Sequence, residues 1–219
     1  MKYKCLVLDH DDTVVDSTAS IHYPSFLAYV AEYRPHLLEN YDRDTFYRKN
    51  FDPGIFAIFR DELGLSDEEL KEEDKFWREY VKRHIPRAFD GFSEIIDEYL
   101  TRGGTIAVVS HSYRDYIERD YRENGLKMPT LVYGWELPAE QRKPSPYPLL
   151  DIMSRLSIEP SDILVVDDLK PGYDMARAAG CDFAAAGWAY NVPEIEAFMR
   201  ANCDYYLPTV DSLRELLFD

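Results

Sequence analysis

Short runs of consecutive apolar residues alternate with helix-like stretches through most of the chain. The runs Ile106–Val109 and Ile163–Val166 are apolar at every position. Strands of this kind are typical of a parallel sheet whose two faces are both covered by helices. The pattern predicts six strands: Lys4–Leu8, Thr105–Val109, Thr130–Tyr133, Asp162–Val166, Cys181–Ala185 and Asp204–Leu207. Since strands and helices alternate, we expect an α/β fold with a Rossmann-like, doubly wound parallel sheet.

Start and stop signals mark the helices between these strands. Ser145-Pro146 is typical of a helix start with Pro in the first turn, and Ser112 with Asp115 resembles a capping box. Gly180 follows the small and apolar residues Met175–Ala179 and indicates a helix end. These helices would cover the faces of the sheet.

Residues 18–88 lack the strand pattern and carry helix signals instead. Asp52-Pro53 predicts a helix start, Gly64 a helix end and Ser66–Glu69 a capping box. The residues behind this box that recur at helical spacing are Leu70, Trp77, Tyr80, Val81 and His84. We expect an all-helical insert of about four helices, by the amphipathic spacing of its apolar positions.

Two domains follow from this division. The α/β core would be formed by residues 1–16 and 89–219, and the inserted helical domain by residues 17–88. A chain of 219 residues has room for a core and a smaller insert.

Composition and charge narrow the classes of function. The chain is 46% hydrophobic and 30% charged, which is typical of a folded protein. Its formal net charge of −16 argues against nucleic acid as a partner, because phosphate backbones are bound by Lys and Arg. No apolar run approaches the roughly 18 residues of a membrane span, and no secretory cleavage site is seen, so we expect a cytoplasmic protein without a membrane partner. The three cysteines indicate neither a disulfide framework nor a zinc site.

Acidic residues follow the first predicted strand. Asp9, Asp11, Asp12 and Asp16 lie just beyond Leu8, and ligands in open α/β sheets bind at the carboxyl ends of strands. Carboxylates gathered there would repel one another, and Mg²⁺, which prefers carboxylate oxygens, would offset the repulsion. Asp9 and Asp11 point the same way in an extended segment, so one can act as nucleophile and the other as general acid/base. An acidic turn without chemistry is the alternative.

Three more motifs follow strands or precede helices. Ser110 could donate to a phosphate oxygen at a helix N-terminus, or simply cap that helix. Lys143 precedes a rigid Pro and could neutralise a nucleophile and a transferring phosphoryl group, or be an ordinary surface lysine. Asp167 and Asp168 would complete a metal site with Asp9. Because all four motifs would meet at one sheet edge, together they predict a phosphoryl-transfer site.

The order of these motifs resembles that of the haloacid dehalogenase-like superfamily. The matching segments are Leu6–Thr13, Val108–Ser110, Lys143–Pro146 and Val165–Gly180, with Phe89–Phe92 similar to the segment that re-enters the core. The resemblance implies a phosphatase of the phosphoglycolate phosphatase or beta-phosphoglucomutase-like branch. It also implies that the helical insert is a type-1 cap domain, and that the substrate is a small phosphorylated metabolite bound by a monomer or a homodimer.

The resemblance assigns a role to each matching residue. Asp9 would attack phosphorus and form an aspartyl-phosphate, and Asp11 would protonate the leaving group and then activate water. Ser110 and Lys143 would hold the phosphoryl oxygens. Asp168 would bind Mg²⁺ together with Asp9 and the backbone carbonyl of Asp11.

Some positions depart from the family pattern. Asp167 stands where relatives carry Gly or Glu and is a further candidate metal ligand. Asp12 replaces a frequent Gly, and His10 replaces an aromatic or aliphatic residue. His111 stands where relatives often have Asn and is a candidate for contacting the substrate. The other candidate substrate-binding residues precede Asp52-Pro53, where a solvated helix end is the alternative: Arg48, Lys49 and Asn50.

Three other functions were weighed against a phosphatase. A phosphosugar mutase of the same family would share every catalytic residue. A dehalogenase is disfavoured, because it would lack the acid at Asp11. A binding protein on this fold is disfavoured too, because the full set of catalytic residues is present.

Overall fold

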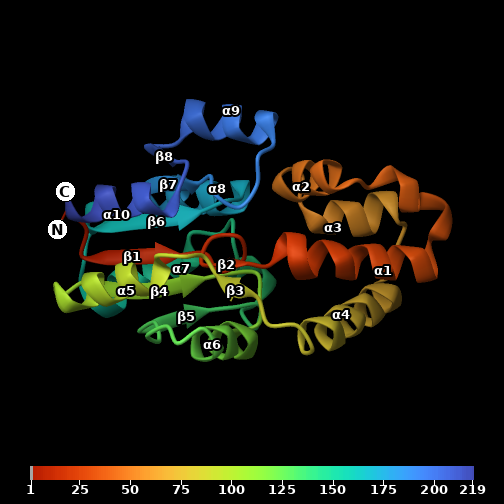
Figure 1. Ribbon diagram of the computed structural model, residues 1–219, viewed down its shortest axis with the longest axis horizontal. Coiled ribbons are helices and arrows are strands. Elements are labelled where there is room, and N and C mark those ends of the chain that lie inside the picture. Colours follow the sequence, from red (N-terminus) through yellow and green to blue (C-terminus); the bar gives the residue numbers. More distant parts are fainter. Residues whose placement is uncertain (1) are drawn as a thin grey trace.

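A computed structural model describes residues 2–219 and contains a six-stranded parallel sheet, ordered β5-β4-β1-β6-β7-β8 (Figure 1). Its strands are β1 (Cys5–Leu8), β4 (Thr105–Val109), β5 (Leu131–Tyr133), β6 (Ile163–Asp167), β7 (Asp182–Ala186) and β8 (Tyr205–Leu207). Each bound lies within one residue of the sequence-based prediction. The predicted α/β fold with a parallel sheet is confirmed.

The two faces of the sheet are buried by different helices. Leu6 and Leu8 of β1 pack in one cluster with residues of α5, α6 and α10, whereas Cys5 and Val7 pack in another with residues of α7, α8 and α9. The bounds of these helices are α5 Phe92–Thr101, α6 Arg114–Glu123, α7 Tyr147–Leu156, α8 Lys170–Ala179, α9 Pro193–Asn202 and α10 Val210–Phe218. Burial on both faces explains why β1 is apolar throughout.

The register of the sheet gathers the strand ends that carry polar residues. Leu8 of β1 pairs with Val108 of β4 on one side and with Val166 of β6 on the other. The residues that follow these positions, Asp9 and Asp167 among them, therefore lie at the same edge of the sheet.

A helical insert, residues 18–81, lies beyond that edge (Figure 1). It comprises η1 Thr18–His22, α1 Tyr23–Tyr33, η2 Pro35–Asn40, α2 Arg43–Phe51, α3 Ile55–Ala57, η3 Ile58–Glu62 and α4 Asp67–Val81. The chain enters through β2 (Val15–Asp16) and leaves through β3 (Arg87–Ala88), which pair antiparallel. The insert has an apolar cluster of its own, built on Phe26, Val30 and Ile58 among others.

Some helix signals in the insert and the core were interpreted correctly and others were not. The capping box of Ser66 and Glu69 is confirmed at the start of α4. The start predicted at Asp52-Pro53 is wrong, because Asp52 ends α2 and α3 begins at Ile55. The capping box of Ser112 is also wrong: α6 begins at Arg114 after Tyr113, and the Ser112 hydroxyl donates to a buried carboxylate instead.

Aromatic pairs join the insert to the core. Tyr47 of α2 stacks on Tyr190 with ring centroids 4.2 Å apart. Phe56 of α3 stacks on Trp135, at 5.4 Å with planes 8° apart. Such contacts fix the insert over the carboxyl edge of the sheet.

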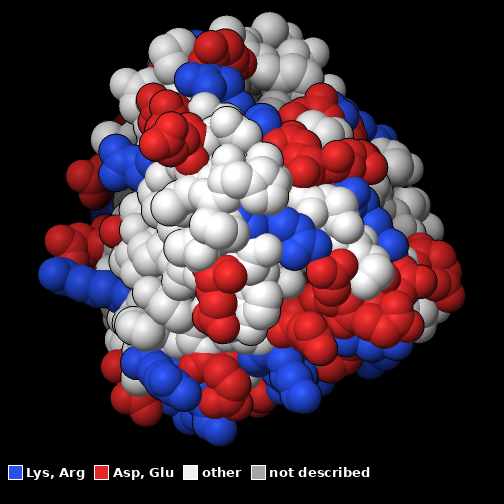
Figure 2. Space-filling view, turned by 90° about the vertical axis from the view of Figure 1, so that its right-hand side faces the viewer, with Lys and Arg blue, Asp and Glu red and all other residues white. Residues whose placement is uncertain are grey.

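The surface agrees with an acidic, folded chain. Figure 2 views the molecule from the end of the insert, where acidic and basic side chains are interspersed around an uncharged area. No helix within residues 2–219 has both the length and the hydropathy needed to cross a membrane.

Candidate active site

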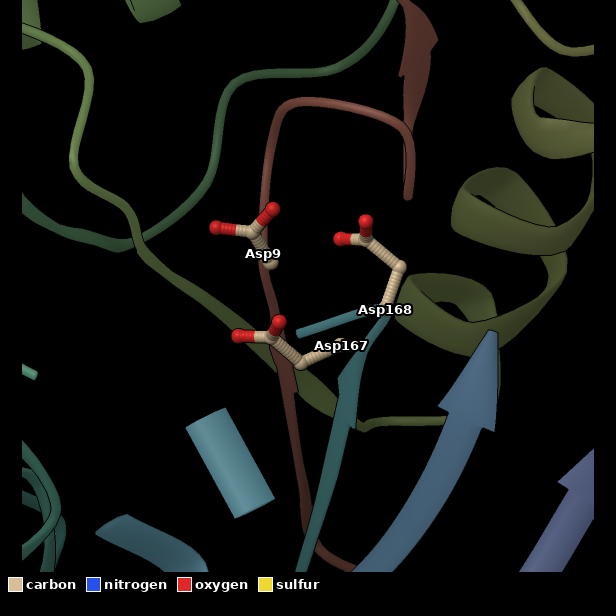
Figure 3. Close-up of side chains that lie close together, drawn as sticks. All are labelled: Asp9, Asp167 and Asp168. Carbon is tan, nitrogen blue, oxygen red and sulfur yellow. The ribbon is translucent and has the colours of Figure 1, made fainter. Parts of the chain in front are cut away.

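Three carboxylates meet at the carboxyl edge of β1 and β6. Asp9 follows β1, Asp167 ends β6 and Asp168 comes next (Figure 3). Each offers an oxygen, and these three oxygens all lie within 4.8 Å of one another. All three side chains are buried. Carboxylates crowded in this way require positive charge close by.

Lys143 supplies the first positive charge. Its Nζ donates to Asp9 Oδ1 and to Asp167 Oδ2, each at 2.7 Å. Burial lowers the pKa of Lys143, but the two carboxylates outweigh burial and hold that pKa well above its usual range. Asp167 Oδ1 accepts from the backbone N–H of Leu169 at 2.8 Å, so both Asp167 oxygens are occupied. Asp167 thereby orients Lys143 toward Asp9.

Gly172 in α8 lies directly against Asp167. A Cβ atom at position 172 would overlap the Asp167 carboxylate. Glycine at this position therefore lets the helix approach the ion pair closely.

One lysine does not balance three buried carboxylates. Burial raises the pKa of Asp9 to about 7 even though Lys143 opposes that rise. Burial also raises the pKa of Asp168 well above its usual range, and the neighbouring carboxylates add to the rise. Within residues 2–219 the Asp168 carboxylate receives a single hydrogen bond, from Thr13 Oγ1 at 3.5 Å. These residues fit a divalent cation, because it would satisfy Asp168 and neutralise the excess charge.

Asp11 has a separate set of partners. Its carboxylate accepts from Ser17 Oγ at 2.8 Å, from His22 Nε2 at 2.8 Å and from Ser112 Oγ at 2.5 Å. Burial raises the pKa of Asp11, but His22 and Ser112 outweigh burial and hold that pKa well below its usual range. The side chain is therefore an ionised, fully bonded carboxylate in this arrangement.

The insert reaches Asp11 through His22. Trp77 Nε1 on α4 donates to His22 Nδ1 at 3.1 Å. Because an indole N–H can only donate, Nδ1 is an acceptor and the His22 proton resides on Nε2, facing Asp11. The helix α4 thus fixes the tautomer of the ring that holds Asp11.

These residues line a cavity of about 460 Å³ between the sheet edge and the insert. Ser110 and His111 line it on the core side, together with Asp9, Asp11, Lys143 and Asp168. His111 hydrogen-bonds through Nε2 to the backbone carbonyl of Lys143 at 3.1 Å. Burial lowers the pKa of His111 to about 4, so the ring is neutral at pH 7 and donates this bond.

The three candidates of α2 are not brought together. Asn50 lines the cavity. Arg48 pairs with Glu194 of α9 at 3.5 Å, and Lys49 pairs with Glu62 at 2.5 Å. Neither basic side chain is part of the cavity wall.

Comparison with known proteins adds the family. Residues 6–186 match the family model described as haloacid dehalogenase-like hydrolase. The chain belongs to the haloacid dehalogenase-like hydrolases. The resemblance stated from the motifs is thereby confirmed.

Curated relatives of this hydrolase are phosphatases by name. It is 27% identical over 142 residues to a phosphoglycolate phosphatase of Thiobacillus denitrificans, covering 64% of this chain and 57% of that protein. It is 26% identical over 201 residues to an N-acetylmuramic acid 6-phosphate phosphatase of Pseudomonas aeruginosa, covering 89% and 86%. The first match spans less than two thirds of the relative's own length.

A solved structure shows the same fold. A haloacid dehalogenase-like family hydrolase from Streptococcus pneumoniae has a TM-score of 0.75 at 18% identity, covering 99% of this chain and 98% of that one.

Two departures from the family pattern have structural explanations in this hydrolase. Asp12 has a φ of 57°, the left-handed region that favours Gly, and its Oδ1 accepts from the backbone N–H groups of Ser17 and Thr18. His10 is buried with its Nε2 3.1 Å from Asp120. Asp12 orders the first turn of the insert, and His10 pairs beneath the sheet edge.

Glu73 on α4 is the residue that sequence reasoning missed altogether. Its side chain lines the cavity, is 9% exposed, and makes no hydrogen bond with any residue in 2–219. Burial, with a smaller contribution from Asp74, raises the pKa of Glu73 to about 8. Only its position on the Leu70–Trp77 helical face could have indicated it.

We expect Glu73→Gln to stabilise the fold at alkaline pH. The pKa of Glu73 is raised from 4.5 to about 8 by folding, so wild-type stability is fully present below pH 4.5 and is lost as pH rises toward 8. Gln does not titrate, so the variant should gain a few kcal/mol of unfolding free energy at pH 8.5, and little at pH 4.5. Urea unfolding at both pH values measures this, with the exposed Glu72→Gln as control. An equal change at both pH values would contradict a buried, titrating Glu73.

Proposed function

We propose that this hydrolase is a Mg²⁺-dependent phosphatase that cleaves a small phosphomonoester through an aspartyl-phosphate on Asp9. The observation that carries the proposal is the arrangement around Asp9: a buried lysine on one oxygen, the underbonded Asp168 beside it, and a second carboxylate, Asp11, two residues on. The phosphatase names of the curated relatives support the same class of reaction.

The proposed reaction begins with attack on phosphorus. Asp9 Oδ1 is held by Lys143, which leaves Oδ2 to form the new P–O bond as the ester P–O bond breaks. Lys143 and the Ser110 hydroxyl line the cavity beside Asp9 and would stabilise the phosphoryl oxygens. Asp9, Asp168 and the backbone carbonyl of Asp11 would hold Mg²⁺, which when bound neutralises charge on the phosphoryl group.

Asp11 would carry the proton in both halves of the reaction. It would give a proton to the leaving oxygen, and then remove one from the water that hydrolyses the aspartyl-phosphate. Ser17 and Ser112 donate to it in the ionised state, and their hydroxyls can rotate to accept when Asp11 is protonated. His22 keeps the carboxylate in place throughout.

We further propose that the insert acts as a cap domain formed by residues 17–88, on a core of residues 1–16 and 89–219. The insert's own apolar cluster supports a separate unit, and β2 with β3 forms the crossing between the two. The cavity lies between both parts, so substrate selection would depend on the insert.

Phosphate release from a panel of phosphomonoesters tests the function. With Mg²⁺ we expect release from at least one ester, and with EDTA we expect loss of that release that added Mg²⁺ restores, because Asp9 and Asp168 need the cation. Release that persists in EDTA would contradict the metal requirement. Phosphoryl transfer only with a bisphosphorylated activator would favour the mutase.

A further inference from the structure

The cavity above Asp9 is larger than a two-carbon phosphate ester requires. Its volume is about 460 Å³. Cavities of roughly 300–1,000 Å³ hold drug-sized ligands, and they bury most of the ligand surface. A leaving group that fills this space would extend from the sheet edge well into the insert.

The wall contributed by the insert and the neighbouring loops is mainly aromatic. The rings that line the cavity include Phe26, Phe46, Phe59, Trp77, Tyr113 and Trp135. Several are fixed by contacts outside the cavity. Trp135 is stacked on Phe56 and lies 3.8 Å from the Arg142 guanidinium, measured to the ring centroid. A fixed aromatic wall favours a flat apolar ligand, because little side-chain entropy is lost on binding.

Glu73 is the polar group of this wall that has no partner. It lies on α4 one turn before Trp77, is nine-tenths buried, and makes no hydrogen bond with any other residue of the described chain 2–219. Its neighbour Asp74 accepts from the Tyr113 hydroxyl at 3.0 Å, so Asp74 is already occupied. A buried carboxyl without a partner is costly unless a ligand provides one.

The same wall is poorly suited to a second negative charge. Among the basic side chains that line the cavity, Lys143 is held by two carboxylates and Lys71 is exposed to solvent. Glu73 and Asp74 are the charged groups of α4 that face a ligand together with Lys71. A short leaving group that ends in a carboxylate, such as that of phosphoglycolate, would meet acids and lack a buried cation.

We propose that the substrate is a phosphomonoester whose leaving alcohol carries a flat aromatic or heteroaromatic ring and an N–H donor that bonds Glu73. The inference rests on the proposed phosphatase function, since it names the substrate class of that same site. The phosphoryl group would lie at Asp9, the ring against the aromatic wall, and the N–H group at Glu73.

Matched esters test this proposal with the wild-type protein and Mg²⁺. The probes are 4-(aminomethyl)benzyl phosphate, the near-isosteric 4-ethylbenzyl phosphate, and 2-phosphoglycolate. We expect kcat/KM for the amine ester to exceed that for the ethyl ester by roughly 10- to 100-fold, as a hydrogen bond to a charged group allows. Both ring esters should exceed 2-phosphoglycolate by at least about tenfold. In Glu73→Gln the ratio of amine to ethyl ester should fall toward one, whereas in the exposed Glu72→Gln it should stay at the wild-type value.

Binding of the corresponding phosphonates, measured by calorimetry, separates the two proposals. Tight binding of the amine phosphonate that Glu73→Gln weakens, without hydrolysis of any ester, would support the ligand class and overturn the phosphatase. Hydrolysis of 2-phosphoglycolate that equals or exceeds that of the ring esters would overturn the ligand class and leave the phosphatase standing. An amine preference that survives in Glu73→Gln would overturn the role of Glu73.

Discussion

Asp9→Asn is expected to abolish phosphate release while the protein stays folded. The amide is a poor nucleophile and a weak metal ligand, so we expect kcat to fall by at least roughly 10³-fold. Asn still offers an oxygen to Lys143, and the change removes one of three crowded acids. The melting temperature should therefore be equal to or above that of wild type, because burial already disfavours the charged form of Asp9.

The matched control is Asp90→Asn, since Asp90 is exposed on the surface. Its phosphate release and melting temperature should equal those of wild type. Substantial turnover by purified, folded Asp9→Asn would show that another group attacks phosphorus.

Lys143→Met should lower both activity and stability. Loss of a fixed positive donor at a transition state costs about 3–4 kcal/mol in comparable sites, so kcat/KM should fall by two to three orders of magnitude or so. The unfolding free energy should drop by about 3 kcal/mol near neutral pH, because two buried carboxylates lose their shared cation. That loss should shrink as pH falls, since protonation of Asp9 and Asp167 removes the repulsion.

The exposed Lys127→Met, whose ion pair with Asp97 lies on the surface, is the control for removal of a lysine. Steady-state kinetics and denaturant unfolding at pH 5 and pH 8 measure both effects. Wild-type kinetics in Lys143→Met would mean that this cation takes no part in the reaction.

The sheet was predictable because its signals are local. A strand such as Ile163–Asp167 is buried on both faces, so every position is constrained to be apolar, and the run itself reveals the strand. The carboxyl-end rule then placed Asp9 and Asp167 at one edge without knowledge of the side-chain contacts.

The partners of Asp11 were not predictable in the same way. Ser112 has the local signature of a helix cap, but its hydroxyl instead meets a carboxylate from a segment 101 residues earlier. Trp77 meets His22 across 55 residues of the insert. Contacts of this range depend on how the insert sits on the core, which local patterning does not encode.

The candidates of α2 show the limit for helices buried on two sides. Phe46 and Asn50 are four residues apart, lie on one face and both line the cavity, whereas Tyr47 and Phe51 pack toward the core. The basic residues between them face away from the cavity. With apolar residues on two faces, the sequence could not indicate which face meets a ligand.

The close approach of Gly172 to Asp167 restricts how this protein could be made more robust. Replacing a helical glycine by alanine is a common route to thermostability, with gains of up to about 1 kcal/mol. At position 172 the added methyl group would displace the Asp167 carboxylate, and Lys143 with it. Engineers and natural selection alike would have to trade catalytic geometry for the stability gained, so this position is closed to the usual improvement.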